Sequence, residues 1–492
     1  MGIVLGLDVG SSSVKASLIN SETGISVASE KYPDVEMDIS SPYFGWAEQD
    51  PEYWWECVLQ VIQRVCSKSE FSPRQIEAIG ISYQMHGLVA LDSNGKPVRP
   101  SIIWCDSRAA QIGNEARNKI GNKTVSHLLN SPGNFTSSKL RWVKINEPEI
   151  YNRIDSIMLP GDYIAYRLTN EIRTTVGGLS EGIFWDFKEN CISKEVLKIY
   201  EFDSALLPEV VPTIGIQSLV SSEGEKLTGI KKGTPIAYRA GDQPNNAMSL
   251  GVMEPGEIAA TGGTSGVVYA LTDQLICDPS ERINTFAHVN HSDSFNRLGM
   301  LMCINGTGIQ YAWLRGILDP SKSYHELEKI ANEAKPGSDG LIALPFGNGA
   351  ERIFNNKIIG GQLSHLDFNR HGVSHLLRAG LEGIAFTFQY GLECLKELGF
   401  QSRKMRVGND NLFQSQIFSD TLATLSGCQI DVYNTSGAEG AARAAAVGAG
   451  LKDSLKSYQS SLEKIKTYSP LHDSDEYQNA YLSWKEELKK HI

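Results

Sequence analysis

The sequence predicts an α/β protein built from two related domains. Strand and helix patterns alternate along the chain, which is typical of α/β architecture. With 492 residues the chain exceeds what one ordinary hydrophobic core organises, so two domains are expected. A strand, a turn of small polar residues and a second strand open the chain, and the same pattern returns near its middle. We place the domain boundary at residue 240, which divides the chain into 1–240 and 241–492.

The N-terminal domain is expected to begin with three consecutive strands, IVLGLDV (3–9), SVKASLIN (13–20) and SVASEKY (26–32). A helix should start at Pro51, because Asp50 can cap its free backbone N–H groups and proline fits the first helical position. Apolar residues then recur at helical spacing, and the pair Trp54 and Trp55 is expected in the core. IEAIGIS (76–82) is typical of a buried strand.

The middle of the chain repeats the opening pattern after one further strand. GTPIAYRAGDQPNN (233–246) is predicted as a strand followed by a loop. GEIAATGGTSGVVYAL (256–271) then contains a strand, a small polar turn and another strand. Helices are expected towards the end of the chain, in DTLATLSG (420–427), in GAARAAAVGAG (440–450) and in the polar tail after Pro470.

Composition argues against several classes of protein. The formal net charge of −11 disfavours a nucleic-acid-binding surface, which needs a basic patch, although backbone N–H groups can still bind phosphate. The eight cysteines contain no Cys-x-x-Cys pair, so neither a zinc ribbon nor a disulfide framework is indicated. The N-terminus enters a strand directly, and no apolar run reaches the roughly 20 residues that span a bilayer. We expect a soluble cytoplasmic protein without nucleic-acid or membrane partners.

Two small polar turns are candidate anion sites. The first, Gly10 to Ser13, follows the acid Asp8, and the second, Thr261 to Ser265, holds the same place in the second half. Successive backbone N–H groups in such turns attract anions, and glycine lets a phosphate approach the backbone closely. An acid beside bound phosphate suggests a bridging Mg²⁺, which prefers carboxylate and phosphate oxygens. The alternative is an ordinary hairpin turn in which the aspartate accepts local hydrogen bonds.

Two common nucleotide motifs are absent from the sequence. The chain contains no G-x-x-x-x-G-K-[ST] P-loop and no G-x-G-x-x-G fingerprint. If a nucleotide binds, it therefore binds through hairpin turns, which is the arrangement of actin and hexokinase.

Polar residues after two predicted strands are candidates for chemistry. Asp242 ends one strand and can accept a proton from a substrate hydroxyl, or can simply cap a turn. Gln84 and His86 follow another buried strand, where the alternative is a core histidine with a satisfied hydrogen bond. The pair His288 and His291 lacks further ligand candidates, so no metal site is expected there.

Taken together, these segments resemble the FGGY family of carbohydrate kinases, and within it the xylulose-kinase branch. The resemblance covers roughly residues 2 to 450. Its segments follow the order of the family: GLDVGSSSVK, GWAEQDPEYWW, ISYQMHGLVALD, RPSIIWCDSR, KLRWVKINEPEIYNRI, MLPGDYIAYRLTNE, AGD (240–242) and ATGGTSG (260–266). The resemblance implies an α/β fold of two actin-like, hexokinase-like (ribonuclease H-like) ATPase domains with an active-site cleft between them.

The resemblance also implies roles for individual residues. Asp242 matches the family's catalytic base, and Asp8 and Asp242 match the carboxylates near its metal ion. The sugar would contact Gln84, Met85, His86, Trp104, Asp242 and Gln243. The nucleotide would contact Gly10, Ser11, Ser12 and Lys15 on the first turn, Gly263 and Thr264 on the second, Gly306 and Gly308, and the adenine-side residues Gly408, Asn409 and Asn411.

The implied activity is the phosphorylation of D-xylulose to D-xylulose 5-phosphate, with ATP and Mg²⁺ as cofactors and a small-molecule sugar as partner. Kinases for gluconate or another ketopentose are alternatives, and gluconate would need a cation such as Arg108 or Arg239 for its carboxylate. A non-catalytic sugar or nucleotide sensor on the same fold is an alternative of another class. A homodimer is one expected assembly.

Three positions depart from the family pattern. Arg239 stands before the catalytic acid where small residues are usual, and it would lower the pKa of Asp242 if the two pair, or else face solvent or a structural acid. Cys105 stands where asparagine is frequent. The adenine-side loop RVGNDNLFQ (406–414) keeps Gly408 but lacks further glycines.

Overall fold

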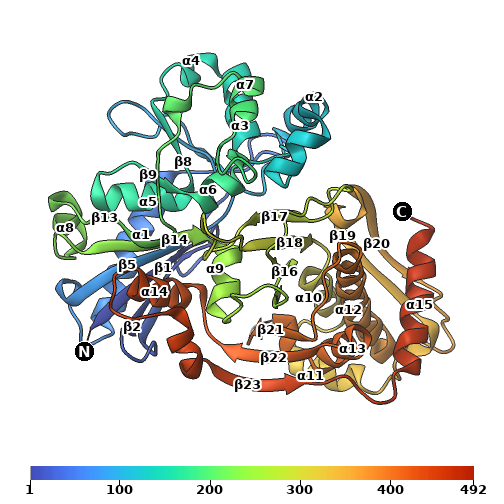
Figure 1. The fold of residues 1–492 in the computed structure, drawn as a ribbon. Helices are drawn as coiled ribbons and strands as arrows, with labels where there is room; N and C mark the ends of the chain where they lie inside the picture. Colours follow the sequence, from blue (N-terminus) through green and yellow to red (C-terminus); the bar gives the residue numbers. More distant parts are fainter. Residues whose placement is uncertain (1, 410) are drawn as a thin grey trace.

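Two mixed β-sheets with the same strand topology organise the chain (Figure 1). The computed structural model describes residues 2–409 and 411–492. The first sheet has the order β13 (Ile214–Leu219), β14 (Pro235–Gly241), β5 (Ile76–Tyr83), β1 (Ile3–Val9), β2 (Val14–Asn20) and β3 (Ser26–Tyr32). The second has the order β17 (Asn284–Ala287), β18 (Leu298–Ile304), β16 (Gly266–Thr272), β15 (Ile258–Gly262), β21 (Lys404–Gly408), β22 (Gln429–Asn434) and β23 (Glu463–Tyr468).

The pairings of the six strands in the first sheet are repeated in the second, to which β17 adds a seventh strand beside β18. Each sheet contains an antiparallel hairpin, β1–β2 or β15–β16, whose second strand pairs with a further antiparallel strand, β3 or β18. The first strand of each hairpin pairs on its other side with a parallel strand, β5 or β21, and a second parallel strand follows, β14 or β22. An antiparallel strand, β13 or β23, forms the edge of the sheet. The α/β fold and its two related halves are therefore confirmed.

The opening elements follow from local sequence signals. The first three strands lie where they were expected, within one residue, and the N–H of Gly10 donates to the carbonyl of Ser13 (3.1 Å) to close the first hairpin. The first helix, α1 (Pro51–Ser67), begins as predicted, because the carboxylate of Asp50 accepts the N–H of Glu52 at 3.0 Å. Trp54 and Trp55 are buried, as expected.

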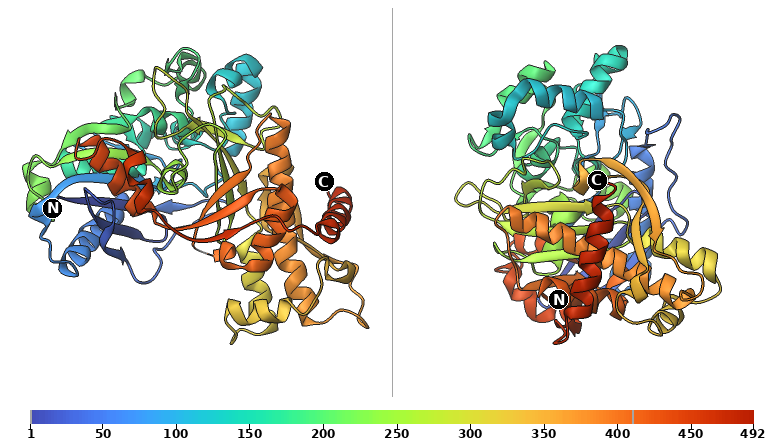
Figure 2. Two further views of the ribbon diagram at one scale, coloured as in Figure 1. Left: turned by 60° about the horizontal axis from the view of Figure 1, so that its bottom comes forward. Right: turned by 90° about the vertical axis from the view of Figure 1, so that its right-hand side faces the viewer.

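The remaining elements surround the two sheets (Figure 2). Five short ladders pair β4 (Glu48–Gln49) with β7 (Ser101–Ile102), β6 (Val89–Leu91) with β8 (Ser156–Met158), β9 (Arg173–Thr175) with β12 (Glu209–Val211), β10 (Trp185–Asp186) with β11 (Cys191–Ile192), and β19 (Ile342–Glu351) with β20 (Lys357–Ser364). Helices of the first half are α2 (Ala110–Leu128), α3 (Thr136–Asn146), α4 (Pro148–Tyr151), α5 (Pro160–Thr169), α6 (Val176–Glu181), α7 (Lys194–Tyr200) and α8 (Ser222–Thr228). Helices of the second half are α10 (Gly308–Leu318), α11 (Tyr324–Ala331), α12 (Val373–Glu397), α13 (Gln416–Ser426) and α15 (Asp475–Lys489).

None of the helices in residues 2–409 and 411–492 has the length and apolarity to cross a bilayer.

The segment after β14 is a helix, α9 (Asp242–Ser249), and not the loop that the sequence suggested. Pro244 lies in the first turn of this helix, where its missing N–H is not needed. Ala247 and Met248 are buried, and α9 packs against β15 and β16 of the second sheet. Tertiary packing therefore stabilises a segment whose polar sequence carries little helical signal of its own.

A second helix, α14 (Gly437–Gly448), packs across the first sheet although it follows β22 of the second (Figure 1). Its alanines are buried against the first sheet, and it also contacts α9. The approach is close enough to require glycine: a Cβ on Gly6 would lie 1.8 Å from the carbonyl oxygen of Ala438, and one on Gly80 would lie 2.0 Å from that of Ala441. α9 follows a strand of the first sheet and packs on the second, and α14 follows a strand of the second sheet and packs on the first, so the two helices couple the lobes.

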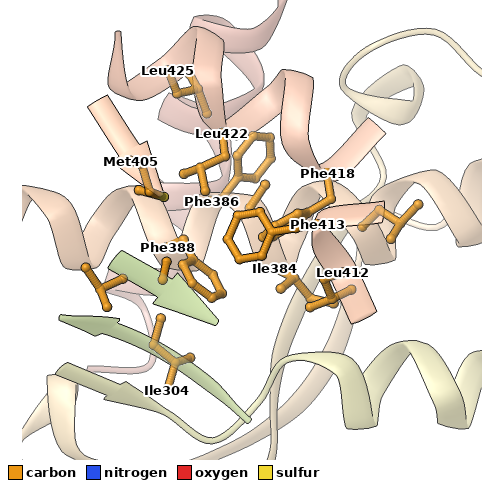
Figure 3. Close-up of a cluster of buried hydrophobic side chains, with 14 of the residues drawn as sticks. Ile304, Ile384, Phe386, Phe388, Met405, Leu412, Phe413, Phe418, Leu422 and Leu425 are labelled. Atoms are coloured by element: carbon orange, nitrogen blue, oxygen red, sulfur yellow. The ribbon is translucent and has the colours of Figure 1, made fainter. Parts of the chain in front are cut away.

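The core of the second lobe lies between its sheet and the long helices α12 and α13 (Figure 3). Phe388, Phe413 and Phe418 meet edge to face, with ring centroids 5.2 to 6.2 Å apart. The helix predicted after Pro470 is α15, whose Trp484 is fully buried and donates its Nε1–H to the carbonyl of Ala343 (3.0 Å). This core holds the second sheet and its turns in place.

Acid should destabilise the fold through His288. Burial lowers the pKa of this imidazole from 6.5 to about 3. Between these values the unfolded chain binds a proton that the folded protein excludes, so stability is complete above pH 6.5 and is lost progressively as the pH falls towards 3. We expect His288→Gln to lessen the loss of stability between pH 7 and pH 5 by about 2 kcal/mol.

Thermal or urea unfolding at both pH values measures this effect. His325, which is exposed, provides the control His325→Gln, whose pH dependence should equal that of the wild type. Equal pH dependence of wild type and His288→Gln would contradict the prediction.

Candidate active site

Three candidate residues meet at one edge of the first sheet. β1, β5 and β14 run parallel and adjacent, so their carboxyl ends lie together. Asp8 lies near the end of β1, Gln84 directly follows β5, and Asp242 directly follows β14. The N–H of Gln84 donates to the carbonyl of Val9 (2.9 Å), which joins two of these strand ends. Ligands of open α/β sheets bind at this edge.

Asp8 and Asp242 are close enough for the charge of one to affect the other. Burial, and then the negative charge of Asp8, raises the pKa of Asp242 to about 7, while hydrogen bonds from Gln243 oppose the rise. Ser82 Oγ donates to Oδ1 of Asp8 (2.9 Å). On the other side, a Cβ on Gly437 at the start of α14 would lie 2.9 Å from Oδ2 of Asp8. The start of α14 therefore lies directly against the carboxylate of Asp8, where a side chain would not fit.

The chemistry of this donor set fits Mg²⁺. Magnesium takes one or two carboxylates and completes its shell with water and phosphate oxygens. Among the residues that the structure describes, no three histidine, cysteine, aspartate or glutamate side chains cluster around a metal position. A cation beside Asp8 and Asp242 would therefore depend on ligands from water and a bound phosphate.

The first turn presents its backbone and one cation towards the same edge. Lys15 is exposed and pairs in register with Asp8, so the two side chains leave the same face of the sheet. The carbonyl of Ser12 accepts the N–H of Met37 (2.8 Å). Together with the hydrogen bond that closes the turn at Gly10, this contact fixes the conformation of the turn.

Gln49, which the sequence reasoning missed, connects the first turn to the sugar-side residues. Its Nε2 donates to the carbonyl of Ser11 (2.7 Å), and its Oε1 accepts from Trp54 Nε1 (3.0 Å) and Gln84 Nε2 (3.3 Å). Trp104 is half exposed and donates its Nε1–H to Ser11 Oγ (3.3 Å). Gln84 and Trp104 therefore lie beside the first turn.

Met85 and His86 lie against the strand that carries Asp242. A Cβ on Gly241 would lie 2.6 Å from Cγ of Met85. His86 has a φ of 61°, a left-handed conformation that non-glycine residues adopt at a cost and often at functional sites. Its Nδ1 hydrogen-bonds with the carbonyl of Glu181 (3.0 Å), which requires a proton on Nδ1 because a carbonyl only accepts. Nε2 of the neutral ring is then an acceptor.

Neighbouring groups keep the imidazole of His86 neutral. Burial, and then the charge of Lys139, lowers the pKa of His86 to about 3. The ammonium of Lys139 is buried and donates to the carbonyls of His86 (2.8 Å) and Ile103 (2.9 Å). Phe135 and Phe286 stand beside the imidazole with centroids 4.7 and 5.3 Å away. Phe286 belongs to β17, so the second sheet contributes to this wall.

Glu181 is a second group that sequence reasoning missed. Its carboxylate is buried, and neither oxygen has a hydrogen-bond partner among the residues that the structure describes. One oxygen would lie 3.1 Å from a Cβ on Gly241, and it stands 3.9 Å from Nδ1 of His86. Burial raises the pKa of Glu181 well above its usual range, and the charge of Asp242 acts in the same direction. No motif marks this residue, because only the fold brings it to the strand ends.

The second turn is tied to the loop that precedes α10. The carbonyl of Gly263 accepts the N–H of Gly308 (3.1 Å), and the carbonyl of Thr264 accepts the N–H of Ile309 (3.1 Å). The side chain of Thr264 itself is exposed. A Cβ on Gly308 would lie 2.2 Å from the carbonyl oxygen of Gly263, so this approach needs glycine. The structure thus brings three nucleotide candidates together in one place.

Glu351 supports the same loop and was not found from the sequence. Its carboxylate accepts the N–H groups of Asn305 (3.0 Å) and Gly306 (2.8 Å). A Cβ on Gly306 would lie 1.9 Å from the carbonyl oxygen of Pro345, so a side chain is excluded there too. Among the described residues no hydrogen bond joins the first turn to the second; the two stand on separate sheets.

The adenine-side residues follow β21, which runs parallel to β15 of the second hairpin. Gly408 ends this strand, and Asn409 is exposed, with its N–H donating to the carbonyl of Tyr433 (3.0 Å). The side chain of Asn411 lies outside what the structure describes. Gly408 and Asn409 therefore share the edge of the second sheet that carries the second turn.

Arg239 and Arg108 are both engaged in buried ion pairs. Arg239 Nε lies 2.9 Å from Oδ1 of Asp162, so it faces a structural acid and does not pair with Asp242. Arg108 bridges Glu48 (2.7 Å) and Asp106 (2.7 Å). Neither guanidinium is available for a substrate carboxylate. Cys105 is exposed beside Trp104 in the chain.

Comparisons with known proteins agree with this geometry. The chain is 28% identical to the xylulose kinase of Escherichia coli (strain K12) over 456 residues, which cover 92% of this chain and 91% of the relative. Among solved structures, a xylulose kinase from Lactobacillus acidophilus (TM-score 0.90, 23% identity) covers 100% of this chain and 98% of its own. A gluconate kinase from the same organism (TM-score 0.89, 23% identity) covers 99% and 98%. At this identity, the likeness to the two solved structures establishes only that the two-lobed fold is shared.

The family model decides the classification. Residues 3–249 match the N-terminal domain of the FGGY family of carbohydrate kinases. The matched segment is half of the chain, and it contains β1 to α9 with the first turn, the Met85–His86 segment and Asp242. With relatives matched over nearly its whole length, the chain belongs to the FGGY family and is a carbohydrate kinase, an enzyme that transfers a phosphoryl group to a sugar hydroxyl.

Proposed function

We propose that this kinase phosphorylates D-xylulose on its terminal O5 hydroxyl, with ATP as donor, and releases D-xylulose 5-phosphate and ADP in the cytoplasm. The observation that supports this most is the half-buried carboxylate of Asp242, which follows β14 beside Asp8 and the Met85–His86 segment. The choice of D-xylulose rests on the relatives, since the xylulose kinase of E. coli is similar over nearly the whole chain.

Asp242 acts as the general base in this proposal. It accepts a hydrogen bond from the O5 hydroxyl, orients an oxygen lone pair towards the γ-phosphorus, and takes the proton late, as the bond from O5 to phosphorus forms and the bond to the ADP oxygen breaks. Phosphoryl transfer passes through a loose transition state, so orientation matters more than strong basicity. A carboxylate whose pKa is raised to about 7 by burial is suited to this role.

The remaining candidate residues divide between the two substrates. Gln84, Met85, His86, Trp104 and Gln243 are proposed to bind the sugar, and Nε2 of His86 is the free acceptor for a sugar hydroxyl. Gly10, Ser11, Ser12, Lys15, Gly263, Thr264, Gly306, Gly308, Gly408, Asn409 and Asn411 are proposed to bind ATP, with domains divided at residue 240. Mg²⁺, held by Asp8 and Asp242 directly or through water, would neutralise charge on the phosphates. Closure of the two lobes would exclude water and limit ATP hydrolysis.

Two other functions are less well supported. A gluconate kinase would need a cation for the substrate carboxylate, and neither Arg108 nor Arg239 would supply it, because both are engaged with Asp162, Glu48 and Asp106; the relatives matched over nearly the whole chain favour D-xylulose. A non-catalytic sensor would be expected to lose the catalytic acid or a phosphate turn, and this chain keeps both.

Substrate specificity tests the proposal directly. In an ADP-coupled assay with D-xylulose, L-xylulose, L-ribulose, gluconate and glycerol, we expect kcat/KM for D-xylulose to exceed the others by at least about tenfold, which is the discrimination that one or two well-placed hydrogen bonds provide. Omission of magnesium should abolish turnover. A preference for gluconate would favour the gluconate alternative, and no turnover by folded protein with any of these sugars would favour the sensor.

A further inference from the structure

We propose that Arg352 is a substrate-binding residue, contributed by the second half of the chain, whose guanidinium donates hydrogen bonds to oxygens of the acceptor sugar. The proposal rests on the sugar site proposed above around His86. It adds a guanidinium from the second half of the chain to a site whose other proposed sugar contacts come from the first sheet and its loops and from the start of α9.

The position of Arg352 is set by its neighbours in the chain. It directly follows β19, and the two residues after it, Ile353 and Phe354, are buried. Glu351 before it is fixed by the N–H groups of Asn305 and Gly306. The guanidinium is oriented by its Nε–H, which donates to the carbonyl of Glu281 (2.8 Å). Backbone and side chain are therefore held before any ligand arrives.

The distal end of Arg352 points towards the sugar-side wall. Its Cζ stands 5.9 Å from the ring centroid of Phe135, and that ring packs 4.7 Å from the imidazole of His86. The positive charge of Arg352 contributes to the lowered pKa of His86, and burial lowers the pKa of Arg352 itself. The charge of Arg352 also acts on Cys303, as does that of Asp242. Arg352 therefore stands beside Phe135, on the wall that also holds the proposed histidine ligand.

The donor groups of this guanidinium are unused. Neither Nη1 nor Nη2 makes a hydrogen bond or an ion pair with any residue that the structure describes. Arg352 is half-buried, so a ligand that supplies oxygen atoms can reach these donors and form charge-assisted hydrogen bonds with them. Arginine presents these donors in a fixed planar fork that suits two oxygens, such as vicinal hydroxyls, a carbonyl with a hydroxyl, or a carboxylate. A polyhydroxylated acceptor matches this requirement, and Arg108 and Arg239 do not compete for it because both are paired.

Steady-state kinetics of Arg352→Gln and Arg352→Lys test this inference, with sugar and ATP each varied in turn. Loss of a charged donor pair should raise the KM for the sugar about 10- to 100-fold in Arg352→Gln, and less in Arg352→Lys, which keeps the charge but loses the fork. The KM for ATP should stay within threefold of the wild type. Titration calorimetry of the sugar alone should show the same loss of affinity. Arg370→Gln, an exposed arginine without an ion pair among the described residues, is the matched control and should behave as wild type.

Each outcome decides the question. An unchanged sugar KM with a folded Arg352→Gln variant overturns the proposal, and a rise confined to the KM for ATP assigns the guanidinium to the nucleotide instead. If Arg352→Gln does not fold, Arg352→Lys decides alone, since unchanged sugar affinity in that variant contradicts a role for the fork. If the wild-type protein binds none of the sugars, the proposed function itself is refuted. If the wild type and its Arg352 variants bind sugar equally tightly, only the role of Arg352 is refuted.

Discussion

Asp242→Asn should lower kcat about 10³-fold while the protein remains folded and binds its sugar. Asparagine has nearly the same shape as aspartate but cannot accept the proton of the sugar hydroxyl, and a positioned general base contributes typically 10²- to 10⁴-fold to a rate. Folding should not suffer, because the variant no longer buries a carboxylate beside Asp8. The measurements are the coupled assay for kcat, calorimetry for sugar binding and thermal unfolding for stability.

Asp273→Asn provides the matched control, since Asp273 is exposed on the second lobe and lies outside the site. Its kcat should equal that of the wild type. If Asp242→Asn is folded, binds sugar and turns over at nearly the wild-type rate, Asp242 is not the base, and Glu181, whose carboxylate lies against the neighbouring Gly241, becomes the next group to examine.

Sequence was sufficient where the signal is local. The hairpin that follows Asp8 and the helix that starts after Asp50 are determined by residues within a few positions of each other, such as a small polar turn or a capping carboxylate. The repeat of that hairpin in the second half was visible for the same reason. The two sheets with matched pairings then follow from how such units pack.

Sequence was insufficient where a residue is defined by a distant neighbour. The helix that begins at Asp242 was expected as a loop, because the contacts that stabilise it come from the second sheet and from α14. Gln49, Glu181 and Arg352 carry no motif of their own. Each becomes recognisable only when the fold brings it to the first turn, to His86 or to Phe135. Unpaired buried oxygens identify Glu181, and contacts with distant segments identify Gln49 and Arg352; both kinds of signal are visible only in three dimensions.

Gly80→Ala should destabilise the protein by at least about 3 kcal/mol, the upper end of what overpacking costs. The added methyl group would stand 2.0 Å from a backbone carbonyl oxygen of Ala441, and neither a β-strand nor a helix backbone can move aside locally. Differential scanning calorimetry should show a fall in Tm of about 3 °C or more, because the unfolding entropy of a chain of this length is about 1 kcal/mol/K. Gly316→Ala on α10, where no atom lies within 4 Å of the new methyl group, is the control and should leave Tm equal or slightly higher.

The same substitution should impair catalysis, although Gly80 touches no substrate. α14 packs on the first sheet over Gly6 and Gly80, and its first residue, Gly437, lies against the carboxylate of Asp8. Displacement of this helix would therefore move Gly437 away from the carboxylate of Asp8 and loosen the contact between the lobes. We expect a higher KM for ATP in any Gly80→Ala protein that folds, and faster proteolysis of the segment between β22 and α14. Wild-type values for Tm and for the KM of ATP would show instead that the helix adapts, and that the coupling of the two lobes does not depend on this close approach.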